Sequence, residues 1–466
     1  MKKIEIELAE IPKPQIFTAV APTFLTDETM NERKKKVLDN MHSEDFDALV
    51  IYADKEHGGN FEYLTGFIPR FEEGLLVLDK NGECTLILGN ENLKMAKVAR
   101  IDNHLIHSPL FSLPNQPMDN EARLETIFET IGLAEKNKIG VVGWKMFTTT
   151  ESDNDTYFDL PYFIIQALLA SKDEHAVLKN AAHLMIRGDK GARTTNNANE
   201  IAHYEYGANL SSNSILNAMD AVEVGVTEAR LGNELTAEGQ TNTVVTIAAT
   251  GQRFEYGNVY PTHKQVTLGD PLSLTTAFKG GLSSRTGFVI ENETQLPENQ
   301  QDYLERVAKP YYKAVTTWLE TIKIGMAGKE LYQTIETVLP QSNYHWHLNP
   351  GHLVSDEEWM SSPIYAGSDE TLKSGMILQI DIIPSVAGYT GVSAEECVAL
   401  ADLNLQRQIK EEYPALWQRI VTRKNYLMEV LNIELNEEII PLSNTVGYLR
   451  PFYLAKNKAF RCVKQN

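Results

Sequence analysis

The chain has 466 residues, of which 42% are hydrophobic and 23% are charged, so it is long enough to form two domains with separate cores. Acidic residues outnumber basic ones by 63 to 43, which gives a net charge of -20 at pH 7. Because this charge repels phosphate backbones, the composition argues against nucleic acid as a partner.

The composition also bears on the compartment. The start, MKKIEIELAE, has two lysines but no apolar stretch behind them, which is not the pattern of a secretory signal. No run approaches the roughly 20 apolar residues that a membrane helix needs. The three cysteines, Cys84, Cys397 and Cys462, are widely spaced, which favours a reducing environment over a disulfide framework. We therefore expect a cytoplasmic protein that has no membrane contact.

The first third of the chain alternates helix and strand patterns. Residues 28–42 read as a charged amphipathic helix, and residues 46–53, FDALVIYA, as a strand. The stretch 74–89 holds two apolar runs joined by a bend with Asn-Gly, which predicts a β-hairpin. KIGVVGW, residues 138–144, predicts another strand. These elements indicate a small α/β domain with a mixed sheet, to which we assign residues 1–165.

The rest of the chain has a different pattern. Long helices are expected between residues 160 and 219, and short strands follow from about residue 240. A helix is expected at 300–323, with strands again at 376–384 and 396–402. Helices interleaved with antiparallel-type strands predict an α+β domain, to which we assign residues 166–466.

Several common catalytic motifs are absent from the sequence. It contains no phosphate-binding loop of the GxxxxGK type, no GxSxG and no HExxH. What remains is His352 behind a Pro-Gly pair, Asp381 inside the apolar run MILQIDIIP, and Glu395 beside a strand. One imidazole and two carboxylates suit a divalent metal or an acid/base site. On spacing alone, a water-facing Asp381 and a loop histidine explain the pattern at least as well.

The wider sequence around these residues resembles the creatinase/aminopeptidase family. NPGHLVSDEEWM, GSDETLKSGMILQIDIIP and GVSAEECVAL are similar to the second half of its "pita-bread" catalytic domain. The resemblance implies a pita-bread domain preceded by a creatinase-like N-terminal α/β domain. It also implies that His352, Asp381 and Glu395 are metal ligands.

Further segments carry the same resemblance in the same order along the chain. YLTGF, at 63–67, resembles the family's N-terminal domain, whereas VEVGVTEARLGNEL, at 222–235, resembles a helix entry in the catalytic domain. IPLSNTVGYLRPF, at 440–452, resembles the end of relatives. Family members with an N-terminal domain commonly pair, so the resemblance implies a homodimer.

The two aspartates that relatives place on a strand pair are missing from the sequence. The opener Gly269-Asp270 is followed by residues 271–290, which contain neither Asp nor Glu. Counting along the family pattern puts Thr275 at the first ligand position, and Ser283 or Ser284 at the second.

Two close divalent ions need several anionic ligands to offset their repulsion, so we do not expect a dinuclear centre. We expect either no metal or one ion, Zn, Mn or similar. Its ligands would be His352, Asp381 and Glu395, because three protein ligands with water suffice for catalytic zinc.

Other site roles follow from the same resemblance. The substrate-binding histidine of relatives falls at Asn258, and His263 lies five positions further on. Arg285 either points into the pocket, where it would neutralise Asp381 or Glu395, or faces solvent. The catalytic set would then be His352, Glu395 and Glu396, with Glu396 as a proton carrier.

Two readings of the function stay open. One is a hydrolase related to Xaa-Pro dipeptidase and aminopeptidase P, which acts on a short peptide or small amide with one metal or, as in creatinase, without metal. The other is a non-catalytic binding protein that keeps the pita-bread fold. This second reading is favoured by the residues at the family's ligand and substrate positions, which carry less charge or bind metal less well than those of relatives. They are Asn258, Thr275, Ser283 and Trp359.

Overall fold

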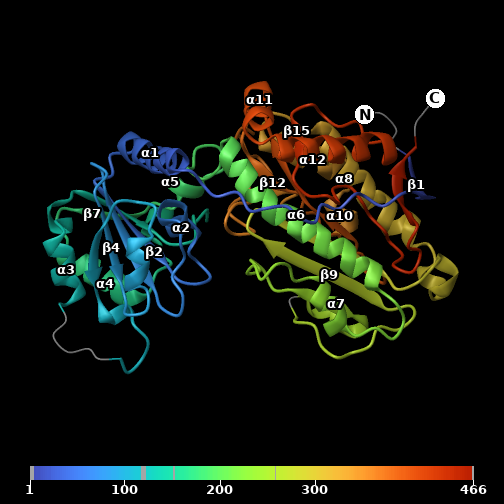
Figure 1. Ribbon diagram of the computed structural model, residues 1–466, viewed down its shortest axis with the longest axis horizontal. Coiled ribbons are helices and arrows are strands. Elements are labelled where there is room, and N and C mark those ends of the chain that lie inside the picture. The colour runs from blue at the N-terminus through green and yellow to red at the C-terminus, as the bar shows by residue number, and fades with distance from the viewer. Residues whose placement is uncertain (1–4, 117–121, 151–152, 258, 464–466) are drawn as a thin grey trace. The chain divides into compact units, whose positions relative to one another are not determined.

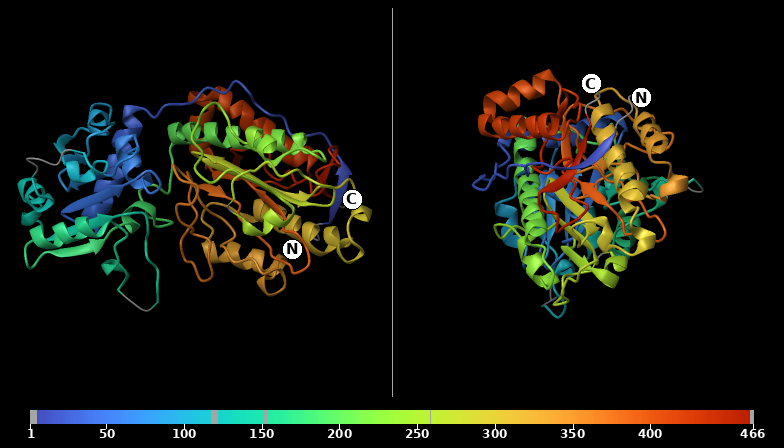
Figure 2. Two further views of the ribbon diagram at one scale, coloured as in Figure 1. Left: turned by 90° about the horizontal axis from the view of Figure 1, so that it is seen from below. Right: turned by 90° about the vertical axis from the view of Figure 1, so that its right-hand side faces the viewer.

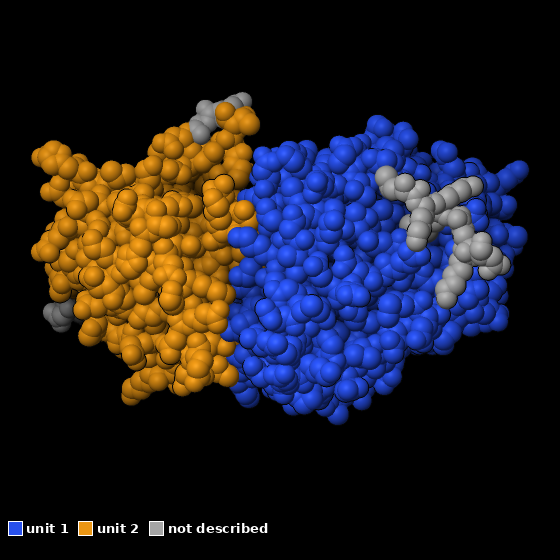
Figure 3. Space-filling model, turned by 90° about the horizontal axis from the view of Figure 1, so that it is seen from above, with its two compact units in different colours: residues 1–24, 195–466 blue, residues 25–194 orange. Residues whose placement is uncertain are grey.

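The computed structural model describes residues 5–116, 122–150, 153–257 and 259–463. The chain divides into two compact units: an N-terminal unit of residues 25–194, and a C-terminal unit that combines residues 1–24 with 195–466 (Figure 3). This division differs from the boundary at residue 165 that we expected. Strand β7 (Val177–Asn180) pairs with β6 (Lys138–Val142), which extends the N-terminal unit beyond that point.

The N-terminal unit contains a six-stranded mixed sheet in the order β5-β4-β3-β2-β6-β7 (Figure 1). Its other strands are β2 (Ala48–Ala53), β3 (Gly74–Asp79), β4 (Cys84–Leu88) and β5 (His104–His107). Its helices are α1 (Asp27–Ser43), α2 (Gly59–Thr65), α3 (Leu124–Thr130), α4 (Tyr162–Ser171) and α5 (His183–Ile186). The predicted hairpin is confirmed: β3 and β4 pair antiparallel, and Gly82 has a φ of 89° at the turn.

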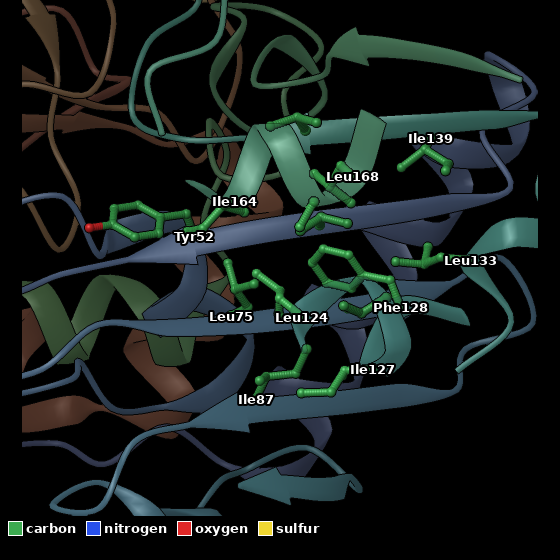
Figure 4. Packing of buried hydrophobic residues seen from close by; sticks show 14 of the residues in the cluster. Tyr52, Leu75, Ile87, Leu124, Ile127, Phe128, Leu133, Ile139, Ile164 and Leu168 are labelled. Atoms are coloured by element: carbon green, nitrogen blue, oxygen red, sulfur yellow. The ribbon is translucent and has the colours of Figure 1, made fainter. Parts of the chain in front are cut away.

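The core of this unit lies between the sheet and the helices α3 and α4. Figure 4 shows Leu75 and Ile87 from the sheet packed against Ile127, Phe128 and Leu168 from the helices. The central strand β2 is buried at every position, which explains why its sequence is a continuous apolar run rather than an alternating one.

The C-terminal unit contains two four-stranded sheets, β13-β10-β9-β8 and β11-β12-β14-β15. The first consists of β8 (Ile247–Thr250), β9 (Pro271–Phe278), β10 (Gly281–Phe288) and β13 (Ser393–Glu395). The second consists of β11 (His352–Leu353), β12 (Ile377–Gln379), β14 (Cys397–Leu400) and β15 (Ile439–Pro441). A separate antiparallel pair joins β1 (Ile6–Glu10) to β16 (Lys458–Cys462) near the two ends of the chain (Figure 2).

The longest helix of this unit, α6 (Ala198–Ala221), starts at a capping box in which the side chains of Asn197 and Glu200 each bind the other's backbone. The remaining helices are α7 (Glu228–Glu234), α8 (Lys309–Thr321), α9 (Gly328–Val338), α10 (Gln341–Tyr344), α11 (Leu403–Glu412) and α12 (Pro414–Asn425). Buried residues of α6, β12, β14, β15, α11 and α12 form one core cluster. Within the described part of the chain, no helix has both the length and the apolar character to cross a membrane.

The close approach of α6 to the β9–β10 hairpin depends on Gly207. A Cβ at this position would lie 1.9 Å from the carbonyl oxygen of Lys279 in the hairpin turn. We expect Gly207→Ala to destabilise the protein by about 2 kcal/mol, because overpacking outweighs alanine's better helix propensity. Asn217→Ala, at an exposed position of the same helix, is the control and should not destabilise. Urea unfolding of both variants measures the difference, and equal stability of the two would contradict this packing argument.

Candidate functional site

His352 lies in β11 and is fully buried. The preceding Gly351 has a φ of 136°, and a Cβ there would approach the carbonyl oxygen of Gln379 to 2.9 Å, so the turn requires glycine. The ring nitrogen Nδ1 lies 3.2 Å from the carbonyl oxygen of Leu353. Since that oxygen can only accept, Nδ1 carries a proton and Nε2 faces the site.

Two carboxylates approach Nε2 of His352. Glu358 Oε1 lies at 3.0 Å and Asp381 Oδ2 at 3.8 Å. Trp359 stacks on the imidazole, with ring centroids 4.1 Å apart and planes 28° apart. Glu358 was not predicted as a site residue. Its only signal is a run of three acids, residues 356–358, in the loop after the histidine, and loop acids are usually solvated.

Burial and mutual repulsion shift the pKa values in this cluster, which we call the His352 cluster: His352, Glu358, Asp381 and Glu395. Burial raises the pKa of Asp381 to about 6, with Glu358 adding to the rise and His352 opposing it. Burial and the charges of Asp381 and Glu358 raise the pKa of Glu395 well above its usual range. Burial alone would lower the pKa of His352, but Glu358 and Asp381 outweigh it and the net shift is upward. The cluster therefore has more negative charge than one imidazole can balance.

Glu395 and Glu396 are adjacent in sequence but point to opposite faces of the sheet. Glu395 ends β13, where it pairs with Ser284 of β10. Glu396 is fully buried and accepts hydrogen bonds from Ser283 Oγ at 2.9 Å, from Arg285 Nη2 at 2.7 Å and from Thr445 Oγ1. The prediction that Glu396 carries protons in the site was therefore wrong, because these three donors hold it in a structural ion pair.

Neither alternative for Arg285 matches the structure: the side chain is buried rather than facing solvent, and it pairs with Glu396 instead of Asp381 or Glu395. Strand alternation puts it on the same face as Ser283, so it reaches Glu396 rather than the carboxylates of Asp381 or Glu395. Its remaining N–H groups bind backbone carbonyls of Tyr448, Ser284, Glu395 and Thr445. All five donors of the guanidinium are used, so none is left to bind a substrate.

A row of hydroxyl groups lies on the Glu395 face of the sheet. Thr275 Oγ1 and Ser284 Oγ are 2.9 Å apart, and Ser284 Oγ lies 3.1 Å from Ser393 Oγ. The register pairs Ser284 with both Thr275 and Glu395. Of the two serines considered for the second aspartate position, Ser284 therefore shares the face of Thr275 and Glu395, whereas Ser283 does not.

The structure does not place the predicted substrate-binding residues Asn258 and His263 in the cluster's contacts. His263 is exposed on the loop that precedes β9, and Asn258 lies outside the described residues. Asp381 was expected within a strand but follows the end of β12, and it is only 4% exposed. Of the predicted set, the structure brings together His352, Asp381 and Glu395, which is 8% exposed.

The side chains beside Glu395 on this face are the hydroxyl groups of Thr275, Ser284 and Ser393, which add no negative charge that could offset the repulsion between two ions. Among the described residues, no group of three or more His, Cys, Asp or Glu side chains has the arrangement of a metal site. Two buried atoms of the cluster, His352 Nε2 and Asp381 Oδ1, nevertheless make no hydrogen bond of good geometry within the described part of the chain, although Glu358 Oε1 lies 3.0 Å from Nε2. A single ion would use His352, Asp381 and Glu395.

Comparison with known proteins identifies the fold. Residues 202–402 match the model of metallopeptidase family M24. A search of curated protein sequences found no match.

Solved structures that share the fold include three that cover most of this chain. A Xaa-Pro dipeptidase from Bacillus anthracis is 17% identical, with a TM-score of 0.60 over 79% of this chain and 94% of its own. A prolidase from Pyrococcus horikoshii is 18% identical, with a TM-score of 0.60 over 80% and 96%. An X-Pro aminopeptidase from Thermotoga maritima is 16% identical, with a TM-score of 0.59 over 79% and 95%. The expected pita-bread domain with a preceding α/β domain is confirmed.

The two adjacent glutamates allow a matched test of the charge balance. We expect Glu396→Gln to cost about 3 kcal/mol of stability, because it leaves Arg285 buried without its counter-charge. Glu395→Gln should cost nothing at pH 4.5 and should stabilise the protein at pH 8. The raised pKa of Glu395 means that the wild type loses stability as pH rises above the unfolded value, whereas the variant does not. Urea unfolding at both pH values tests this, and similar losses in the two variants would contradict it.

Proposed function

Since residues 202–402 carry the domain of metallopeptidase family M24, we propose that the C-terminal unit binds a short peptide or small amide at the His352 cluster and lacks two-ion catalysis. The observation that carries this proposal is the hydroxyl row of Thr275, Ser284 and Ser393 on the Glu395 face of the sheet. A hydroxyl contributes no charge at neutral pH, so this face cannot offset the repulsion between two divalent ions.

The cluster has polar atoms that suit an amide. Asp381 Oδ1 can accept a hydrogen bond from an amide N–H, and it has no partner among the described residues. A protonated His352 Nε2 can donate to a carbonyl oxygen, provided that the ligand displaces Glu358 from its 3.0 Å approach. Both groups are almost completely buried, so a ligand that satisfied them would remove the cost of leaving them unpaired.

A second candidate is a hydrolase that works with one divalent ion. It is favoured by the position of His352 Nε2 and Asp381 Oδ2, which lie 3.8 Å apart, and by Nε2 and Oδ1, which make no hydrogen bond to any residue that the structure describes. In this case the ion would supply an activated water, while the protein would supply the three ligands His352, Asp381 and Glu395.

Metal titration combined with an activity assay separates the candidates. Protein stripped of metal is titrated with Zn²⁺ and with Mn²⁺ by calorimetry, then incubated with Xaa-Pro dipeptides. We expect at most one ion per chain, dipeptide binding that is lost in His352→Ala, and no hydrolysis. Hydrolysis with one bound ion would establish the second candidate, whereas two ions per chain would contradict both.

Restoring the carboxylates gives a sharper prediction. Thr275→Asp with Ser284→Asp puts two anions on the face of Glu395, so we expect divalent ions to bind at least about tenfold more tightly, a gain of about 1.4 kcal/mol. The matched control, Thr275→Asp with Ser283→Asp, puts the second anion beside Glu396 instead and should not give this gain. Calorimetry measures the difference, and equal affinity of the two double variants would contradict the assignment of Ser284 to this face.

A further inference from the structure

Residues 11–24, IPKPQIFTAVAPTF, which we call the N-terminal strap, run alongside α6 without forming a helix or strand (Figure 1). The strap follows β1, which is anchored to β16 near the other end of the chain. Only Ile11 and Pro14 of the strap are buried, so it lies on the surface of the C-terminal unit. The strap therefore contacts the C-terminal unit as an extended peptide on its surface.

The C-terminal unit holds the strap through side chains that donate to its backbone carbonyls. Both Asn209 and Asn213 donate to the carbonyl of Phe17, at 2.9 and 2.7 Å. Near the end of the strap, Asn199 donates to the carbonyl of Phe24 at 3.1 Å and His203 to that of Thr23 at 2.7 Å. Near its start, Tyr426 donates to the carbonyl of Pro12 at 2.8 Å. Four of these five donors lie on α6.

The backbone N–H groups of the strap, unlike its carbonyls, are almost all without hydrogen bonds to the described residues. Ile11 N–H donates to the carbonyl of Asn457 at 3.1 Å, but from Pro12 to Phe24 no backbone N–H has an acceptor among the described residues. Three strap residues are prolines, which have no N–H to donate. A surface that binds the backbone only through its carbonyls accepts proline at any position without losing a backbone hydrogen bond.

The donors at the centre of this surface are oriented by residues outside the strap. Asn444 Nδ2 donates to the side-chain oxygens of Asn209 and Asn213, both at 2.8 Å, which turns their amide N–H groups toward Phe17. Asn444 is itself fixed, because its oxygen accepts from Arg423 Nε at 2.7 Å. Donors fixed in this way bind a carbonyl at a lower entropic cost.

A buried ion pair supports this arrangement. Arg423 Nη2 lies 2.6 Å from Glu205 Oε1, and Arg419 binds both oxygens of the same carboxylate. Burial alone would raise the pKa of Glu205, but the charges of the two arginines lower it below its usual value. Arg423 also lies over the ring of Phe17, 5.5 Å from its centroid. The pair thus fixes both the asparagine donors and the aromatic contact.

We infer that this face of α6 is a peptide-binding surface that recognises main-chain carbonyls, that the strap is its resident occupant, and that a second copy of the strap segment supplied in trans can replace it. The surface takes an extended, proline-containing peptide. It is separate from the His352 cluster, so this inference does not depend on the proposed function.

The test uses the full chain with a specific protease site inserted between Phe24 and Leu25. After cleavage, a fluorescent peptide of residues 5–24 is added and its binding is followed by anisotropy. We expect the peptide to exchange with the cleaved strap. Because the amides are unused, N-methylation at Ala19 and Ala21 should change its affinity by less than about threefold. Failure to exchange within a day, or a loss above about tenfold on N-methylation, would overturn the inference.

Two further measurements guard against misfolded variants. Asn209→Ala with Asn213→Ala should weaken the peptide about tenfold through two lost hydrogen bonds, whereas Asn217→Ala, on the exposed side of α6, should not. In the intact wild-type protein, hydrogen exchange should find the strap amides from Lys13 to Phe24, prolines aside, within about tenfold of their rates in the free peptide. Strong protection of these amides would refute carbonyl-only recognition without any variant.

Discussion

The alternation of side chains where β13 ends decides the chemistry of the C-terminal unit. Because Glu395 and Glu396 are neighbours in an extended chain, they cannot share a face of the sheet. Glu396 pairs with the buried guanidinium of Arg285, whose remaining donors bind backbone carbonyls. Glu395 is left on the face of Asp381, Glu358 and His352, where three carboxylates surround one imidazole. Such a cluster needs protons, a cation or a polar ligand to balance it.

The fold and the charge balance of the His352 cluster depend on different residues. The pita-bread scaffold needs only the packing of its sheets and helices, and those are intact here, as the TM-scores near 0.60 show. On the Glu395 face, Thr275 and Ser284 present hydroxyl groups bonded to one another, and these groups add no charge to the cluster. Function therefore depends on the site and not on the fold.

Sequence patterns predicted what depends on local chemistry or on family motifs. Asn81-Gly82 predicted the hairpin because few other pairs adopt its turn, and the motif around His352 led to Asp381 and Glu395. The face of the sheet on which the Arg285 side chain lies could not be predicted. Strand alternation assigns a side chain to a face only once the register with the partner strand is known. Glu358 lies in an irregular loop without periodicity. The pairing of β1 with β16 joins segments about 450 residues apart, and no local signal encodes such a contact.

The segment 443–445, within the motif IPLSNTVGYLRPF, connects the two regions to which we assign roles. Asn444 orients the asparagines that bind the strap, whereas the next residue, Thr445, donates its hydroxyl to Glu396 and accepts from Arg285 through its carbonyl. Ser443 accepts a weak hydrogen bond from the backbone of Cys397, at the start of β14. One short segment thus holds the donors of the peptide-binding surface and also the ion pair between Arg285 and Glu396, which leaves Glu395 without a counter-charge. Because its side chains serve both networks, neither can change its geometry without displacing the backbone that the other depends on.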